Sequence, residues 1–391
     1  MDLSFTLFNK RFVNPFILSS APPTRNGEMI KRAFKMGWGG AVTKTFSLEG
    51  VDFVRPRFGI VKSRNRNIGL TNIELISEKD ALYWVKEIKD MKAQYPDRIV
   101  IASIMADLNM DSWTKLASIC QDTPADIIEA NVSCPHGCPE KHMGAFIGQD
   151  PNLVGEVTKA IKKGSNLPLL VKLTSGVTDM VSIGKIAVQN GADGITAINT
   201  ISSIAGIDLE NLAPFPSVGG YGAKGGYSGP GIKPIALGQV WELSKNLNVP
   251  ISGCGGITTW QDSAEFLAVG ASTIQICTAV MWHGYKIIDN LTKGLSDYLE
   301  RKGFESIDKF VGVVKDKIGD YNRLVPYSSN LVADVMADKC NQCKICVTAC
   351  NDGGYQAISC DDKIVFDKAK CGGCSLCMLI CPQDAVRMVN L

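Results

Sequence analysis

Eight cysteines near the C-terminus have the spacing of iron–sulfur ligands. They fall in two runs, CNQCKICVTAC and CGGCSLCMLIC, and each run follows the pattern C-x2-C-x2-C-x3-C. With this spacing, the first three thiolates of a run hold one cluster and the fourth holds the other cluster. We therefore expect two [4Fe–4S] clusters with these ligand sets: Cys340, Cys343, Cys346 and Cys381; and Cys371, Cys374, Cys377 and Cys350.

Zinc and disulfides are the alternative uses of so many cysteines. Zinc sites rarely need four cysteines so closely spaced twice over. Disulfides are rare in the cytoplasm, where we expect this chain because its start, MDLSFTLFNKRFVNPF, lacks the pattern of a signal peptide. Cys360 fits neither ligand set and is expected to be a buried or surface thiol. Because such clusters move single electrons, we expect a second redox group that handles two, and a flavin suits this role better than nicotinamide.

The stretch NVSCPHGC, residues 131–138, places two more cysteines after an apolar run. Cys134 could be a metal ligand, an inert core thiol or a catalytic acid, and free cysteines are commonly buried. A thiol suits the role of acid because its reference pKa of about 8.5 is closer to neutrality than that of a hydroxyl. The residue type alone leaves all three roles open.

Other polar residues share this position directly after an apolar run. They are Lys44, Asn131, Lys172, Asn199 and Thr200. Singly, such a lysine could form a salt bridge and Asn199 could cap a loop. Together at one edge they would line a binding site. The stretches GYSGPGIKP, SGCGGI and ICTA lie near the last apolar runs, and their backbone N–H groups could approach a phosphate.

The elements that must position these residues are short apolar strands alternating with helices. The expected strands are 16–20, 40–45, 98–105, 126–133, 169–174, 194–199, 250–255 and 273–278, with helices that include 78–94, 151–163 and 262–270. Eight such repeats predict a closed (β/α)8 TIM barrel, in which the carboxyl ends of the strands form the active site. An open doubly wound sheet is the alternative, because periodicity does not show closure.

Length and composition predict two domains. The chain has 391 residues, 45% of them hydrophobic, and a formal net charge of +2. We expect a barrel over residues 1–325 and a small α+β ferredoxin-like domain over 326–391. So balanced a charge gives no reason to expect a nucleic-acid partner, and no apolar stretch is long enough to predict a membrane span.

The chain resembles the dihydropyrimidine dehydrogenase family, whose catalytic half is related to dihydroorotate dehydrogenase. The matching stretches are NPFILSSAPPT, GWGGAVTKTF, TNIELISEKDALYW, IVIASIM, NVSCPHG, VKLTSGVTD, GADGITAINT, GYSGPGIKPIAL, SGCGGI and CNDGGYQAI. The resemblance implies an FMN-binding barrel that reversibly reduces uracil or thymine to the 5,6-dihydro base. It also implies a partner subunit with FAD and an NAD(H) site, as in the bacterial two-subunit form, and assembly into an oligomer.

The resemblance also assigns roles to single residues. Cys134 falls on the proton donor to C5 of the pyrimidine, which acts while reduced FMN delivers hydride to C6. The substrate-binding positions are Asn72, Asn131, Ser133, His136, Asn199 and Thr200. The FMN-binding positions are Ser20, Lys44, Lys172, Gly229, Gly255, Gly256, Cys277 and Thr278.

Three other functions stay open at this point. The loop PHGCPEKHMGAFIGQ departs from the family pattern, so the substrate could be a related cyclic amide or another activated C=C bond. Dihydroorotate oxidation is a second enzymatic alternative. A pure electron-transfer module is the non-enzymatic one, although it would need neither Cys134 nor the asparagines.

Overall fold

The computed structural model describes residues 1–135, 141–325 and 330–390. They form two compact units that divide after Lys317. The boundary expected after residue 325 lies beside residues outside the described part, and it stays a prediction. In the described residues, no helix has the length and apolar character needed to cross a membrane.

The first unit is a closed barrel of eight parallel strands, as the repeat pattern predicts. Their order around the barrel is β10-β15-β16-β3-β4-β7-β8-β9. Each lies within or overlaps one expected strand. The bounds are β3 (Phe16–Leu18), β4 (Gly40–Val42), β7 (Ile99–Ile104), β8 (Ile127–Asn131), β9 (Leu169–Lys172), β10 (Gly194–Ala197), β15 (Ile251–Cys254) and β16 (Ala271–Ile276). Closure rules out the open sheet.

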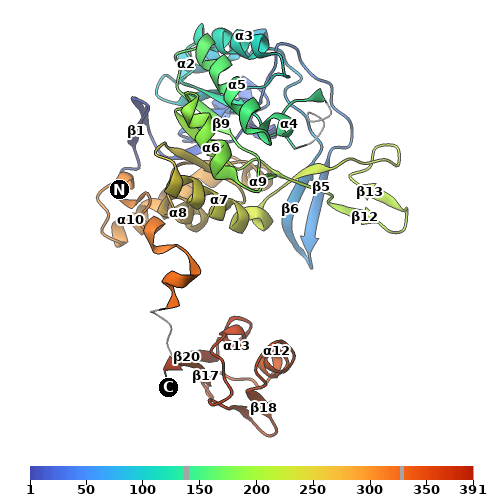
Figure 1. Cartoon of the computed structure of the whole chain (residues 1–391), viewed down its shortest axis with the longest axis vertical. Helices are drawn as coiled ribbons and strands as arrows, with labels where there is room; N and C mark the ends of the chain where they lie inside the picture. Colours follow the sequence, from blue (N-terminus) through green and yellow to red (C-terminus); the bar gives the residue numbers. More distant parts are fainter. Residues whose placement is uncertain (136–140, 326–329, 391) are drawn as a thin grey trace. The chain divides into compact units, whose positions relative to one another are not determined.

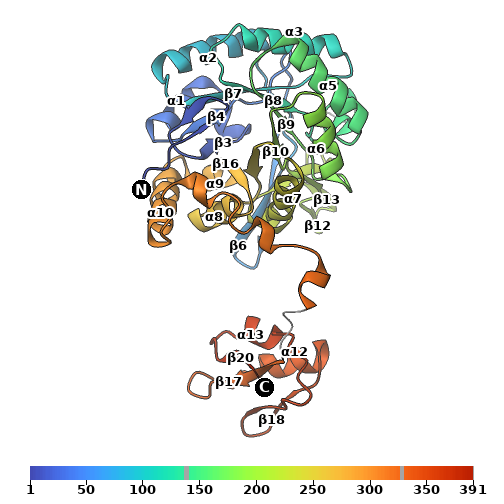
Figure 2. The same ribbon diagram turned by 60° about the vertical axis from the view of Figure 1, so that its left-hand side comes forward.

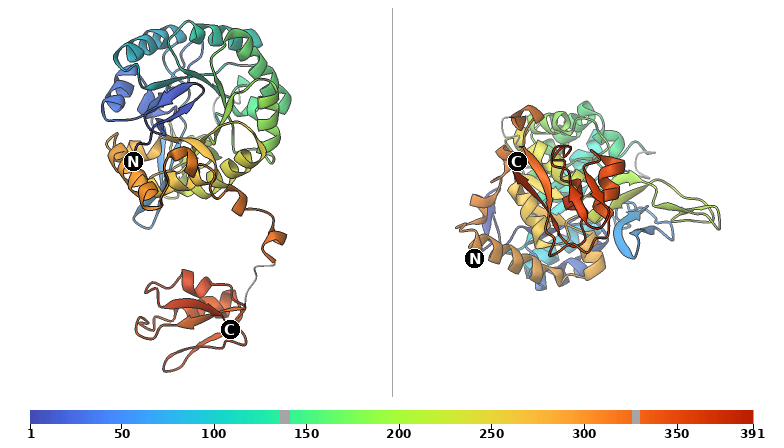
Figure 3. Two further views of the ribbon diagram at one scale, coloured as in Figure 1. Left: turned by 90° about the vertical axis from the view of Figure 1, so that its left-hand side faces the viewer. Right: turned by 90° about the horizontal axis from the view of Figure 1, so that it is seen from below.

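Helices surround the strands in a ring, which Figures 2 and 3 show from two sides. They are α1 (Gly27–Lys35), α2 (Ala81–Gln94), α3 (Met110–Gln121), α5 (Pro151–Gly164), α6 (Met180–Gln189), α7 (Lys233–Asn246), α8 (Trp260–Ala268) and α10 (Ile287–Arg301). Shorter helices are α4 (Ala145–Gly148), α9 (Thr278–His283) and α11 (Ile307–Phe310). Helices α2, α5 and α8 match the three expected helical ranges named above.

Local sequence sets where the helices begin. The Asp80 side chain accepts a hydrogen bond from Tyr83 N at the start of α2. Thr259 and Asp262 form a reciprocal capping box at the start of α8. Such caps satisfy backbone N–H groups that have no partner within the helix. The α8 cap ends the loop after β15, which carries Gly255 and Gly256.

The barrel core is apolar along most of its length. All six residues of β7 are buried, and Trp38, Trp84 and Trp113 are fully enclosed. The hairpin of β1 (Phe5–Leu7) and β2 (Lys10–Phe12) packs against the barrel, where Leu7 and Phe12 border a small apolar cavity with Ile17 and Leu170.

A second, antiparallel sheet is absent from the sequence-based expectation. It has the order β11-β14-β6-β5 and consists of β5 (Phe58–Ser63), β6 (Arg66–Asn72), β11 (Ile201–Ser203) and β14 (Gly225–Ser228). A further hairpin, β12 (Gly206–Asp208) with β13 (Ala213–Phe215), extends from the same side of the barrel (Figure 1). This sheet joins segments far apart in the sequence, so local periodicity gives no sign of it.

The second unit is a small α+β fold. Strands β17 (Leu331–Val335) and β20 (Val386–Asn390) pair antiparallel, as do β18 (Ile358–Cys360) and β19 (Ile364–Phe366). Helices α12 (Ile345–Gly353) and α13 (Leu376–Leu379) complete it. Its core is small, with Ala333, Ile358, Ile364 and Val386 packed among ligand-spaced cysteines. So small an apolar core depends on further links for stability.

Candidate functional site

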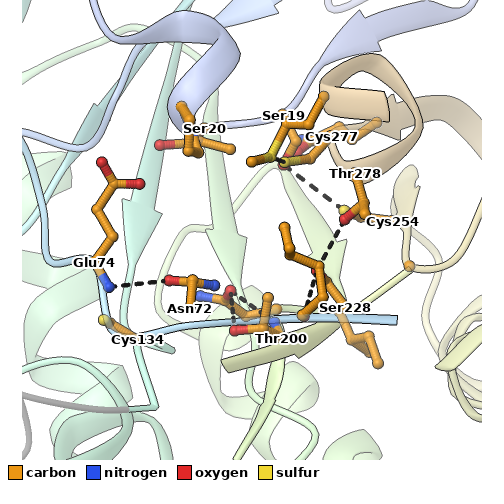
Figure 4. A pocket seen from close by; sticks show the side chains of 18 of the residues that line it. Ser19, Ser20, Asn72, Glu74, Cys134, Thr200, Ser228, Cys254, Cys277 and Thr278 are labelled. Carbon is orange, nitrogen blue, oxygen red and sulfur yellow. Dashed lines mark hydrogen bonds between the residues drawn. The ribbon is translucent and has the colours of Figure 1, made fainter. Parts of the chain in front are cut away.

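One large cavity opens at the carboxyl ends of the barrel strands and brings most of the predicted site residues together (Figure 4). It spans about 1010 Å³, including the open space at its mouth, which suits a cofactor with a small substrate. The predicted residues that line it are Ser20, Lys44, Asn72, Asn131, Cys134, Lys172, Asn199, Thr200, Gly229, Gly255, Gly256, Cys277 and Thr278. Ser133 lies behind its wall, and His136 lies outside the described residues.

A chain of hydrogen bonds orients two of the asparagines. Asn199 Nδ2 donates to Ser133 Oγ at 2.9 Å, and Ser133 Oγ donates to Asn131 Oδ1 at 3.0 Å. Asn131 Nδ2 then donates to Thr45 Oγ1 at 2.9 Å. Ser133 is fully buried, so its place in the structure is that of a link between the two amides.

The second sheet supplies the third asparagine. Asn72 ends β6, where its Nδ2 donates to Gly226 O at 3.1 Å and its Oδ1 accepts from Glu74 N at 3.3 Å. Thr200 lies next to Asn199 and donates its backbone N–H to the Asn199 Oδ1 at 2.8 Å. Figure 4 shows Asn72 and Thr200 on the same side of the cavity as Cys134.

Cys134 lies in the cavity wall three residues after Asn131. It is 7% exposed. Its carbonyl accepts a hydrogen bond from Ala145 N at 2.9 Å. Gly144 has φ +57°, and a Cβ on it would stand 2.7 Å from that carbonyl and 3.0 Å from the Cys134 Cβ. The returning segment thus packs closely against Cys134 and limits its movement. The rival thiol, Cys138, lies outside the described residues.

Both predicted lysines are buried beside a glutamate. Lys44 Nζ lies 3.5 Å from Glu74 Oε2, and Arg57 Nε lies 3.4 Å from Glu74 Oε1. Lys172 Nζ lies 3.7 Å from Glu129 Oε1. Burial lowers the pKa of Lys172, but attraction to Glu129, with smaller contributions from Cys254 and Cys277, holds that pKa above its ordinary value. Two lysine side chains, each within 3.7 Å of a carboxylate, therefore lie on the cavity wall.

The glycines at the other end of the cavity adopt conformations that need glycine. Gly229, Gly255 and Gly256 have φ of +93°, +134° and +74°. A Cβ on Gly256 would stand 2.6 Å from Lys233 N, and one on Gly255 would stand 2.6 Å from the Ala236 Cβ. Glycine is therefore needed at Gly255 and Gly256 for the backbone conformation and for the close approach of α7, and all three glycines line the cavity.

Hydroxyl groups also line the glycine-lined end of the cavity. Thr278 Oγ1 donates to Ser228 Oγ at 2.8 Å, and Ser228 Oγ donates to Leu70 O at 3.1 Å. Ser20 Oγ lies 2.9 Å from Thr45 Oγ1 and accepts from Thr45 N at 2.9 Å. Glycine backbone, hydroxyls and lysines together form a donor set that fits the phosphate and ring of FMN.

The cavity also contains two buried thiols near Lys172. Burial raises the pKa of the Cys277 thiol to about 12 and raises the pKa of Cys254 above its ordinary value. Cys254 Sγ lies 3.7 Å from Ser19 Oγ. Both thiols are therefore neutral near pH 7 and add no charge to this wall.

The second unit has two small cavities, each bordered by four cysteines. Cys350 joins Cys371, Cys374 and Cys377 around one, and Cys381 joins Cys340, Cys343 and Cys346 around the other. These are the two sets that the spacing predicts. Cys360 borders neither of these two cavities. Among the described residues, no three His, Cys, Asp or Glu side chains converge as the ligands of a single metal ion do.

Backbone N–H groups point at several of these sulfurs. Ala357 N donates to Cys350 Sγ at 3.3 Å, and Ala385 N donates to Cys381 Sγ at 3.3 Å. Ala333 N donates to Cys371 Sγ at 3.4 Å. Such donors stabilise thiolate charge, and hydrogen bonds to the sulfurs are one of the factors that set cluster potentials. The donor sets therefore fit two iron–sulfur clusters.

Sequence reasoning did not include several residues of the barrel site. Glu129 and Glu74 pair with the two lysines, and Ser19, Ser228 and Cys254 line the cavity. Glu129 had a usable signal, since it interrupts the apolar run DIIEAN and carboxylates are rarely buried without a partner. No feature of the sequence indicates the role of Ser228, because its contacts depend on the antiparallel sheet that the sequence does not predict.

Each of the two units matches a known protein family. The family model described as dihydroorotate dehydrogenase matches residues 2–299, and the model described as 4Fe-4S dicluster domain matches residues 333–388. A relative from Escherichia coli (strain K12), named NAD-dependent dihydropyrimidine dehydrogenase subunit PreA, is 41% identical over 366 residues, which cover 93% of this chain and 88% of the relative.

Two further relatives differ in how much of the chain they match. The chloroplastic dihydropyrimidine dehydrogenase (NADP(+)) of Arabidopsis thaliana is 38% identical over 352 residues, or 86% of this chain and 83% of the relative. The dihydroorotate dehydrogenase B (NAD(+)) catalytic subunit of Pyrococcus horikoshii is 40% identical over 313 residues, or 80% of this chain and 97% of the relative.

Proposed function

The chain belongs to the dihydroorotate dehydrogenase family, and within it we propose that the protein reversibly reduces the 5,6 double bond of uracil or thymine. The observation that carries the proposal is the convergence of three asparagines and Cys134 on one cavity whose other end offers glycine backbone and two lysines. The relatives named dihydropyrimidine dehydrogenase support it, because they match more of this chain than the Pyrococcus horikoshii relative does.

The substrate end suits a pyrimidine base. The edge of uracil alternates carbonyl acceptors with N–H donors, and an asparagine amide offers one donor group and one acceptor. Asn72, Asn131 and Asn199 hold such amides in fixed orientations through the hydrogen bonds described above. Cys134, on the same side of the cavity, would supply the proton to C5. His136 remains a candidate contact outside the described residues.

The other end suits FMN, which supplies hydride transfer and single-electron exchange when bound. Gly229, Gly255 and Gly256 would bind its phosphate through backbone N–H groups, with Thr278 beside them. Ser20 and Cys277 would border the cofactor. Lys44 and Lys172 would stabilise negative charge on the ring. The two cysteine sets would hold [4Fe–4S] clusters that carry electrons to and from the barrel.

The cofactor content tests this part directly. The protein purified without oxygen should contain non-covalent FMN and about eight iron atoms per chain, as two four-iron clusters require. Flavin extraction with chromatography and metal analysis measure both. FAD as the sole flavin, or zinc in place of iron, would contradict the proposal.

We also propose a partner subunit that carries FAD and the NAD(H) site, within an oligomeric, cytoplasmic enzyme. The sequence offers no convincing G-x-G-x-x-G at a strand–helix junction for NAD, and the relative from Escherichia coli is itself named as a subunit. Alone, the chain should therefore reduce uracil poorly with NADH and well with a chemical donor. Rapid NADH-driven uracil reduction by the isolated chain would refute the need for a partner.

Dihydroorotate oxidation is the second candidate, favoured by the 40% identity to the Pyrococcus horikoshii subunit. The two candidates differ in whether the substrate carries a carboxylate. Turnover of uracil, thymine and orotate by the same reduced preparation separates them. Uracil or thymine should be the faster substrate, and a clear preference for orotate would favour the second candidate.

A further inference from the structure

A buried carboxylate in the barrel has no part in the chemistry proposed so far. Glu129 lies on β8 and is fully enclosed. Its Oε2 accepts hydrogen bonds from Thr196 Oγ1 at 2.9 Å and from Gln275 Nε2 at 2.8 Å. Its Oε1 accepts no hydrogen bond from the described residues and faces Lys172 Nζ at 3.7 Å. Two donors thus hold the carboxylate with its second oxygen toward the lysine.

Lys172 stands between this carboxylate and the cavity. It is 3% exposed and lines the cavity. Its Nζ donates to Ser19 Oγ at 3.2 Å, and Ser19 lines the same cavity. An ammonium group so deeply buried is costly unless an anion compensates it. Glu129 is the anion in contact with it.

We propose that Glu129 is a positioning residue that keeps Lys172 charged and directed at the cofactor. The inference rests on the proposed FMN site, because its effect is on the flavin. Reduction adds negative charge to the ring, and a cation nearby makes that reduction more favourable. Glu129 would therefore raise the reduction potential of the flavin indirectly, by maintaining the cation on Lys172.

The other titratable groups near Lys172 do not replace Glu129. Cys254 ends β15 and Cys277 follows β16, and burial raises the pKa of both thiols, so both are neutral near pH 7. Lys44 and Glu74 act on Cys277 across the cavity. Without Glu129, the first of the groups that offset burial would be gone and the pKa of Lys172 would fall, which favours the neutral amine.

The test is the reduction potential of bound FMN in three variants of the full chain. Glu129→Gln, Lys172→Gln and the double variant each remove the cation, the first by leaving Lys172 neutral. All three should lower the potential, and Glu129→Gln and the double variant, in which neither charge of the pair remains, should lower it by the same amount. A higher potential in Glu129→Gln would mean that Lys172 stays charged without its partner. That result would overturn the inference. An unchanged potential in Glu129→Gln would also overturn it, as would a shift in the double variant equal to the sum of the two single shifts.

The pH dependence and a matched control separate charge from packing. In Glu129→Gln, acidification should return the proton to Lys172 and bring the potential back toward the wild-type curve, whereas Lys172→Gln should show no such recovery. Thr196→Val removes a hydrogen bond to Glu129 but leaves the ion pair, so its potential should stay near that of the wild type. A shift as large as that of Glu129→Gln would assign the effect to packing.

If a variant fails to bind FMN, its reduction potential cannot be measured, and the FMN content of the double variant then decides the test. If Glu129→Gln binds no FMN, the double variant should still bind it as Lys172→Gln does, because Glu129 acts on the site only through Lys172, which the double variant lacks. Loss of FMN from the double variant alongside retention in Lys172→Gln would contradict the inference. A wild-type chain without FMN would instead overturn the proposed function, and the two failures are therefore distinguishable.

Discussion

At the scale of single residues, the site is organised before any substrate binds. The amides of Asn131 and Asn199 are linked through Ser133, and Asn72 is held at both ends of its side chain. Cys134 is confined by the close approach of Gly144. Fixed polar groups of this kind favour catalysis, because little reorganisation is needed as charge develops.

Replacing Cys134 by serine tests the acid. Cys134→Ser should retain fold, FMN and clusters but lose about 10²–10⁴-fold in turnover, because a hydroxyl is a much weaker acid than a thiol and general acid catalysis contributes a factor of this size. Cys134→Ala should lose at least as much. Steady-state reduction of uracil with a chemical donor, at matched flavin content, measures both.

Cys138→Ser is the matched control, since Cys138 is the other thiol of the same stretch. We expect it to stay close to wild-type turnover. The assignment of the acid to Cys134 would be wrong if Cys138→Ser were nearly inactive while Cys134→Ser kept most of its activity.

At the scale of elements, the barrel positions the site through the ends of its strands and the loops that follow. Lys172 ends β9, Asn131 ends β8, and Gly255 directly follows β15. Strand ends are rigid, so the side chains there need little further support. The glycine loops differ, since they depend on backbone conformations that other residues rarely adopt.

Gly256→Ala tests that dependence. With φ +74° and a Cβ placed 2.6 Å from Lys233 N, the substitution should lower the free energy of unfolding by about 1–3 kcal/mol and weaken FMN binding. Gly238→Ala is the control within helix α7, where a Cβ would meet nothing within 4 Å. It should stabilise the protein by up to about 1 kcal/mol and leave FMN content unchanged. Equal FMN affinity in the two variants would contradict the role given to Gly256.

How far the sequence predicts these elements depends on whether the signal is local. The eight barrel strands are apolar runs bounded by turns, and all eight were predictable. The antiparallel sheet was not, because β6 pairs with β14 across more than 150 residues of chain, at Asn72 and Gly226. Family resemblance identified Asn72 and Gly229, which periodicity alone could not assign. Glu129 interrupts an apolar run, which indicates a buried and paired carboxylate, but the sequence does not show that its partner is Lys172.

At the scale of the whole molecule, two units with different chemistry share one chain. The ferredoxin-like unit has a small core in which cysteines occupy much of the interior. Removing its clusters should therefore unfold this unit more readily than loss of FMN unfolds the barrel, because the barrel has a large apolar core of its own.

Cys350→Ser tests the exchange of ligands between the two cysteine runs. Cys350 belongs to the first run by sequence but borders the cavity of Cys371, Cys374 and Cys377. The variant should lose that cluster preferentially, lowering iron from about eight to about four atoms per chain. Cys360→Ser, which alters a cysteine outside both sets, should keep the full iron content. Selective loss of the other cluster, with ligands Cys340, Cys343 and Cys346, would contradict the assignment.

The central claim is that the barrel transfers electrons to a pyrimidine base, and anaerobic reoxidation of the reduced flavin tests it most directly. The protein is reduced chemically without oxygen, mixed rapidly with uracil or thymine, and followed by flavin absorbance, with the product identified by chromatography. We predict fast reoxidation and formation of the 5,6-dihydro base, and slow reoxidation in Cys134→Ser. If neither base reoxidises the wild-type flavin while orotate or another unsaturated compound does, the account of the substrate is contradicted.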